Sequence, residues 1–166
     1  MRRELLACVC ALLAGATAAQ MLPDDPDWKE VEVPRPPPVR TSGLIDLDVP
    51  GATLRFGIDP ASVSIGTDRV VRYVVVATSR TGTVNAMYEG LRCNTGQVRV
   101  YARHNPDSGW VPTRSEEWQA LHSVPHSRHS LAVARTGACI GQGPSGSADQ
   151  IVRALRSGVD RRFVNP

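Results

Sequence analysis

Residues 70–103 carry the pattern that decides the fold, and they read VVRYVVVATSRTGTVNAMYEGLRCNTGQVRVYAR. The stretch Val70–Thr78 is rich in β-branched residues and apolar at odd and even positions, which predicts a strand buried on both faces. Two further strands are predicted at Thr83–Arg92 and Gln97–Arg103, and both intervening segments end in glycine, as turns often do. The stretch therefore predicts a three-stranded antiparallel meander.

Shorter elements are predicted on both sides of this meander. Leu44–Val49 and Thr53–Ile58 alternate apolar with polar residues, and Ser62–Ile65 is a short third candidate strand. Near the C-terminus, Ser147–Gln150 matches a capping box, which predicts an amphipathic helix at about 148–157. The expected fold is mainly β (α+β), an antiparallel meander sheet of about five to six strands with a short C-terminal helix.

The N-terminus has the three regions of a secretory signal. Met1–Glu4 has a net positive charge, Leu5–Ala14 is apolar but too short to span a bilayer, and the small residues Gly15–Ala19 follow. We interpret residues 1–19 as a signal peptide, cleaved after Ala18 or one residue later, and expect a periplasmic or secreted mature protein. No second apolar run in the sequence reaches membrane-spanning length.

Charge and cysteine usage agree with export. The signal contains two arginines and one glutamate, so its removal lowers the net charge from +3 to +2, which makes nucleic acid a poor candidate partner. Cys8 and Cys10 leave with the signal, whereas Cys93 and Cys139 remain as an even pair in an oxidising compartment. These two are expected to form one disulfide; two free buried thiols are the alternative.

The mature chain divides by composition into three parts. Residues 20–42 are Pro-rich and predict an extended linker, although its Trp28 is expected to pack on the domain. Residues 43–160 are expected to form a single domain, and residues 161–166 a tail.

The predicted turns suggest a strand register for the meander. A hairpin in which Ser79 pairs with Gly82 places Arg72 opposite Glu89 on an otherwise apolar face. A charged pair there has to be mutually satisfied. We favour a cross-strand salt bridge near the sheet edge, and the functional alternative is a carboxylate held by an arginine inside a pocket.

The same register aligns the three tyrosines of the chain on the opposite face. Tyr73 faces Tyr88, and if Arg92 pairs with Gln97 across the second turn, Tyr88 faces Tyr101. Three arginines are predicted to share this side of the sheet: Arg92, Arg99 and Arg103. Tyrosine and arginine combine apolar contact with polar donors, so the row is a candidate ligand-binding surface. The alternative is that the C-terminal helix or a tryptophan covers it.

Several of these segments resemble a known family. The VVRY segment at 70–73, the YEGLRC segment at 88–93 and the later Cys139 look like the CNP-like (cryptic neisserial protein) family of exported bacterial proteins. Asp27–Glu30, Trp110 and Trp118 fit the same pattern in order. The resemblance implies an envelope location and a shared fold, and it assigns no catalytic role to any residue.

Metal, cofactor and nucleophile signatures are weak in this sequence. His122, His126 and His129 are spaced for a helical metal site, but Pro125 interrupts the helix, and solvated loop histidines are the favoured interpretation, with no metal or cofactor expected. No sequence motif typical of a catalytic nucleophile or a phosphate-binding loop is present.

The leading hypothesis is a non-enzymatic envelope module that binds an envelope protein or a small ligand through the tyrosine–arginine face. The rival is a small periplasmic hydrolase or lyase with Glu89 as acid or base, which requires a raised pKa of Glu89 in a solvent-reachable cleft. A structural subunit of an envelope assembly, with residues 34–38 as a spacer, is a third possibility.

Export and oxidation can both be tested by mass spectrometry of the protein purified from the periplasm of its own host. We expect an N-terminus at Ala19 or Gln20 and the loss of two hydrogens from Cys93 and Cys139. A chain that retains residues 1–18 and both free thiols would contradict export.

Overall fold

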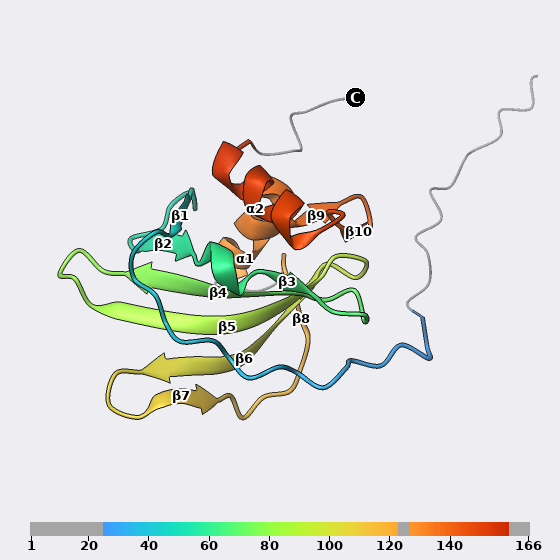
Figure 1. Ribbon diagram of the computed structural model, residues 1–166, viewed down its shortest axis with the longest axis horizontal. Helices are drawn as coiled ribbons and strands as arrows, with labels where there is room; N and C mark the ends of the chain where they lie inside the picture. Colours follow the sequence, from blue (N-terminus) through green and yellow to red (C-terminus); the bar gives the residue numbers. More distant parts are fainter. Residues whose placement is uncertain (1–24, 123–126, 160–166) are drawn as a thin grey trace, which may run out of the picture.

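The computed structural model describes residues 25–122 and 127–159 (Figure 1). The predicted signal peptide and the predicted tail, 161–166, lie outside the described residues. The strands are β1 Ile45–Leu47, β2 Arg55–Ile58, β3 Ser64–Ile65, β4 Val71–Thr78, β5 Val84–Arg92, β6 Gln97–Asn105, β7 Gly109–Pro112, β8 Gln119–Ala120, β9 Cys139–Ile140 and β10 Gly143–Pro144. The helices are a 3₁₀ turn at Pro60–Ser62, α1 Arg128–Val133, a π-helical turn at Ala134–Ala138 and α2 Ala148–Ser157.

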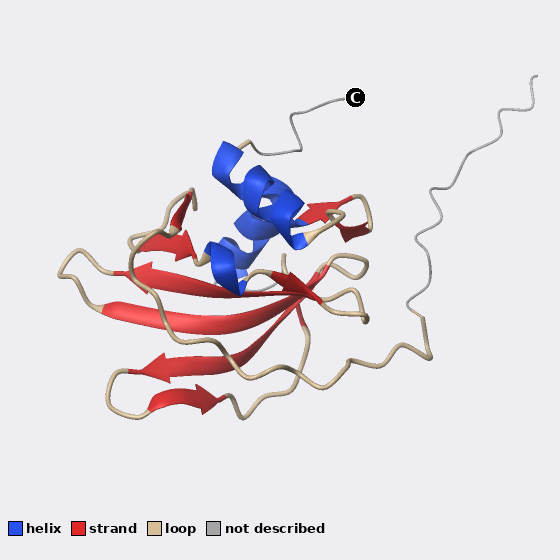
Figure 2. Cartoon of the chain, viewed as in Figure 1, coloured by secondary structure: helices blue, strands red, loops and turns tan. Residues whose placement is uncertain are grey.

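Eight of these strands form one antiparallel sheet, which confirms the predicted mainly β fold (Figure 2). The order is β1-β2-β4-β5-β6-β7, with β3 beside β4 and β8 beside β6, while β9 and β10 pair separately. The helix α2 has the predicted bounds, and its capping box is present, because Ser147 Oγ accepts from the Gln150 amide. No helix among the described residues is long and apolar enough to cross a membrane.

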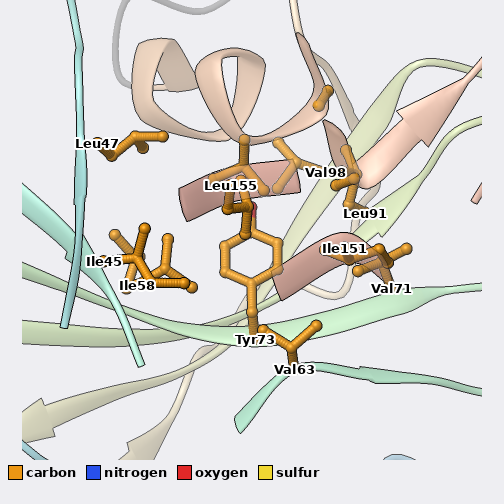
Figure 3. Close-up of a cluster of buried hydrophobic side chains, with 14 of the residues drawn as sticks. Ile45, Leu47, Ile58, Val63, Val71, Tyr73, Leu91, Val98, Ile151 and Leu155 are labelled. Atoms are coloured by element: carbon orange, nitrogen blue, oxygen red, sulfur yellow. The ribbon is translucent and has the colours of Figure 1, made fainter. Parts of the chain in front are cut away.

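Both faces of the sheet are covered, which explains why β4 is buried on both sides. The helices cover one face, and residues 25–42, which we call the N-terminal strap, run across the other (Figure 1). On the helix side, aliphatic residues of the sheet pack against α2, as Ile151 and Leu155 show (Figure 3). On the strap side, Val33 and Val39 pack against a smaller cluster that includes Val74 and Tyr88. Residues of the predicted Pro-rich linker therefore contact the sheet.

The predicted register between β4 and β5 is wrong by one residue. The Ser79 amide donates to the carbonyl of Thr83 (2.9 Å) and the Thr83 amide donates to Ser79 Oγ (3.0 Å), so the turn contains one more residue than predicted. Tyr73 consequently pairs with Glu89, and Arg72 pairs with Gly90. Because side chains alternate between faces, this slip puts Arg72 and Glu89 on opposite faces of the sheet.

The register between β5 and β6 follows the prediction from the turn as far as Glu89, which pairs with Val100. An irregularity between Tyr88 and Glu89 then shifts it, so that Tyr88 pairs with Ala102 instead of Tyr101. An extra residue on one strand is the mark of a β-bulge, which redirects the side chains beyond it. This bulge decides which residues of β6 reach each face.

The predicted disulfide between Cys93 and Cys139 is confirmed in the structure. It joins the end of β5 to the segment that follows α1 and the π-helical turn. A bridge across a loop of this length restricts the unfolded chain and stabilises by about 3–4 kcal/mol on a chain-entropy estimate. It also fixes the position at which α1 and its neighbouring turn return to the sheet.

Candidate functional site

The three tyrosines do not form a row. Tyr73 lies on the helix side, where its ring is surrounded by aliphatic side chains (Figure 3), and its exposed fraction is 1%. Tyr88 and Tyr101 lie on the strap side with ring centroids 5.4 Å apart. The observed β4–β5 register separates Tyr73 from the other two tyrosines. A shift of one residue changes which side chains of β4 and β5 share a face of the sheet.

The N-terminal strap occupies the face on which Tyr88 and Tyr101 lie. Trp28 Nε1 donates to the carbonyl of Asp68 (3.1 Å), and Trp110 Nε1 donates to the carbonyl of Pro37 (2.8 Å). The guanidinium of Arg92 stacks 3.6 Å from the Trp28 ring centroid, which confirms that this tryptophan packs on the domain. The other members of the predicted tyrosine–arginine face therefore lie beneath the strap: Tyr88, Tyr101, Arg92 and Arg99.

Glu30 is the main anchor of the strap. Its carboxylate accepts from Arg72 Nη2 (3.2 Å) and Arg99 Nη1 (2.8 Å), and also from the hydroxyl of Tyr101. The Tyr101 side chain has room beside Gly90 of β5, because a Cβ at that position would collide with the tyrosine hydroxyl. Gly90 thus allows the Tyr101 hydroxyl to donate to Glu30, which also binds Arg72 and Arg99.

The expected ion pair between Arg72 and Glu89 is wrong. Arg72 donates to both carboxylate oxygens of Asp68, at 3.1 and 2.6 Å, in addition to Glu30. Burial lowers the pKa of Arg72, but the hydrogen bonds to Asp68 and the neighbouring carboxylates outweigh this and keep it above its ordinary value. Arg72 is thus a structural cation that joins the sheet to the strap.

Glu89 lies on the helix side in a separate polar network. Its Oε2 accepts from the Tyr73 hydroxyl (2.9 Å) and from Ser130 Oγ (3.0 Å), and its Oε1 accepts from His129 Nε2 (2.8 Å). The His129 ring also stacks on Phe56, with ring centroids 5.0 Å apart and planes inclined by 11°. The network therefore connects β4 and β5 to α1, the helix that carries His129 and Ser130.

The electrostatics of Glu89 favour a fixed carboxylate over an acid or base. Burial raises the pKa of Glu89, but the charge and hydrogen bond of His129 and the two hydroxyl donors outweigh it and leave the pKa below its usual value. Burial, together with the charge and hydrogen bond of the same carboxylate, raises the pKa of Tyr73 well above its usual value. The exposed fraction of Glu89 is 1%, and its lowered pKa is opposite in direction to the raised pKa that the hydrolase or lyase alternative expects.

A groove lies between this network and the surface. It consists of two adjoining cavities, about 440 and 490 Å³ in volume, that share Met87, Arg103 and His129 as lining residues. Arg103, predicted to share the tyrosine face, instead lines this groove on the other face, and its Nη1 contacts Met87 Sδ at 2.9 Å. Ligand pockets commonly have volumes of this order.

The histidines that the structure describes do not gather into a metal site. His129 is bound to Glu89, His122 is exposed, and His126 lies outside the described residues. Within residues 25–122 and 127–159, no group of three or more histidine, cysteine, aspartate or glutamate side chains could hold a metal ion.

Comparison with known proteins is informative at the family level. The CNP1-like family matches residues 23–156. This chain belongs to that family. The matched region begins before the N-terminal strap and ends within α2, so the strap is part of the shared region. No curated protein and no solved structure matches the chain.

Sequence reasoning missed the three residues that organise the two faces. Glu30 falls in the stretch interpreted as a linker and His129 among histidines interpreted as solvated loop residues, while nothing in the sequence singles out Ser130. Glu89, the partner of His129 and Ser130, does stand out in the sequence. It is a carboxylate in an apolar strand, and a buried carboxylate requires donors from elsewhere in the chain. No spacing pattern in the sequence identifies which donors these are.

The role of Glu30 can be measured with a matched pair of variants. Glu30→Gln removes the charge between Arg72 and Arg99, and we expect it to lower the free energy of unfolding by about 2–4 kcal/mol, because Arg99 loses its carboxylate partner and Arg72 keeps only Asp68. Glu32→Gln is the control, since Glu32 is exposed on the same strap. Equal, small effects in urea denaturation would contradict the anchoring role.

The Glu89 network predicts a pH dependence with a definite sign. Because folding lowers the pKa of Glu89, its contribution to stability is complete above the unfolded-state pKa of about 4.3 and is lost as the pH falls toward the folded pKa. We expect the free energy of unfolding to fall more steeply with acidification in the wild type than in Glu89→Gln. The exposed control Glu116→Gln should retain the wild-type slope, and parallel slopes for wild type and Glu89→Gln would contradict the network.

Proposed function

We propose that this member of the CNP1-like family is an exported, non-enzymatic binding protein of the cell envelope, and that its ligand occupies the groove beside α1. The observation that carries the proposal is the pair of adjoining cavities joined through Met87, Arg103 and His129. The tyrosine–arginine face is a weaker candidate, because the N-terminal strap already fills it with Trp28 and Glu30.

Exposed apolar residues at the groove support a binding role. Val111 lines the first cavity with an exposed fraction of 45%, and Leu54 lines the second with 37%. Removing large aliphatic side chains from water lowers the free energy. Their exposure beside the groove therefore favours the binding of an apolar group.

The walls of the groove are held in place before any ligand binds. Its floor is formed by β5 and β6 of the sheet, and the Glu89 network fixes His129 and Ser130 of α1 above it. The disulfide between Cys93 and Cys139 restrains the segment that follows α1. A preorganised site loses less conformational entropy on binding, which favours affinity.

The proposal is tested by native mass spectrometry of the mature protein purified from the periplasm of its own host. We expect a reproducible adduct in the wild type that is lost in Val100→Trp, which fills the first cavity from its half-buried wall. Val84→Trp, a half-buried position on the strap side, is the matched control and should keep the adduct.

Folding has to be verified for each variant by a cooperative thermal transition. If Val100→Trp does not fold, Val111→Trp makes the same test from an exposed position on the groove. A bare wild-type protein, or an adduct that persists in the folded groove variants, would overturn the assignment of the groove.

A further inference from the structure

We infer that the ligand of the groove is an anionic amphiphile, an apolar chain or ring system that carries one carboxylate or phosphate group bound by Arg103. This inference rests on the proposed function and specifies the chemistry of its ligand. It follows from the charges on the groove wall and from the distribution of apolar side chains around them.

Arg103 is the cation common to both cavities. Its guanidinium contacts the sulfur of Met87, and no carboxylate among the described residues forms an ion pair with it. Arg72 and Arg99 differ, since both donate to Glu30 under the strap. An arginine at a hollow without a protein carboxylate is suited to an oxyanion of the ligand, because its planar donors match carboxylate and phosphate oxygens.

Two further arginines stand on either side of Arg103. Arg114 lines the first cavity and Arg128 the second, both are exposed, and neither forms an ion pair with a described carboxylate. Two acidic residues, the buried Glu89 and the exposed Glu117, line the same groove, so its three arginines outnumber its two carboxylates. The charge balance of the groove therefore favours an anion.

The rest of the groove wall is suited to hydrocarbon. Val98, Val100 and Val111 line the first cavity, and Leu54, Phe56 and Ala77 line the second. An inorganic anion at Arg103 would leave these apolar surfaces in water, whereas a neutral hydrocarbon would leave the arginines without a partner. A molecule with one anionic group and an apolar body satisfies both parts of the site.

The inference is tested by isothermal titration calorimetry with four probes: decanoate, decyl phosphate, decanol and inorganic phosphate. We expect the two anionic amphiphiles to bind the mature wild-type protein, and decanol and inorganic phosphate to bind about tenfold more weakly or less. Comparison of decanoate with decyl phosphate identifies which acid group the site prefers.

Charge variants assign the anion to the groove. Arg103→Ala combined with Arg114→Ala should weaken decanoate binding by about tenfold to a hundredfold, because charge-assisted hydrogen bonds are lost, and should leave decanol binding unchanged. Glu117→Gln should strengthen decanoate binding. Arg156→Ala, at an exposed position of α2 outside the groove, is the matched control and should behave as the wild type.

Each contrary result has a distinct meaning. Equal binding of decanol and decanoate, binding unchanged in the double arginine variant, or no binding of any anionic amphiphile would overturn the inference. If a neutral molecule is nevertheless recovered as the native adduct and lost in Val100→Trp, the groove remains the binding site and only its proposed chemistry is wrong.

Discussion

The buried carboxylate of Glu89 is the constraint on which the arrangement of the helix side depends. A carboxylate removed from water costs several kcal/mol unless it is paired and hydrogen-bonded. Tyr73 supplies one donor from the neighbouring strand, but the other two, His129 and Ser130, come from α1. The helix is therefore held to the sheet by a polar requirement as well as by apolar packing, and the groove lies beside that attachment.

A second carboxylate, that of Glu30, has the corresponding role on the other face. It is only 12% exposed and is bound beneath the strap by Arg99 and by Arg72, which also pairs with Asp68. The sheet is thus covered on one side by helices and on the other by an extended segment without regular secondary structure. The burial of β4 on both faces, evident in its run of β-branched residues, follows from this double cover.

The amino-acid sequence predicts the local secondary-structure elements, but it does not predict how they pair and pack. The strands of the meander, the capped helix α2 and the disulfide follow from residue patterns that act over a few positions or through a single pair of cysteines. The register between β4 and β5 depends on whether the turn after Thr78 ends at Gly82 or at Thr83. The amino-acid sequence of this segment is compatible with both turns. That single residue decided the partners of Arg72 and Glu89, and the bulge beside Glu89 decided those of Tyr101. The strap was missed because proline-rich composition is shared by linkers and by extended segments that pack on a sheet.

The β4–β5 register and the Glu89 network are tested most directly by two double-mutant cycles, in which the free energy of unfolding is measured. In the first, Glu89→Gln is combined with His129→Gln, and we expect a coupling of about 1–3 kcal/mol because the two side chains share a buried hydrogen bond. In the second, Glu89→Gln is combined with Arg72→Gln, and we expect nearly additive effects because the two residues lie on opposite faces of the sheet. Strong coupling of Glu89 to Arg72 together with additivity toward His129 would contradict the register, the network and the groove that depends on them.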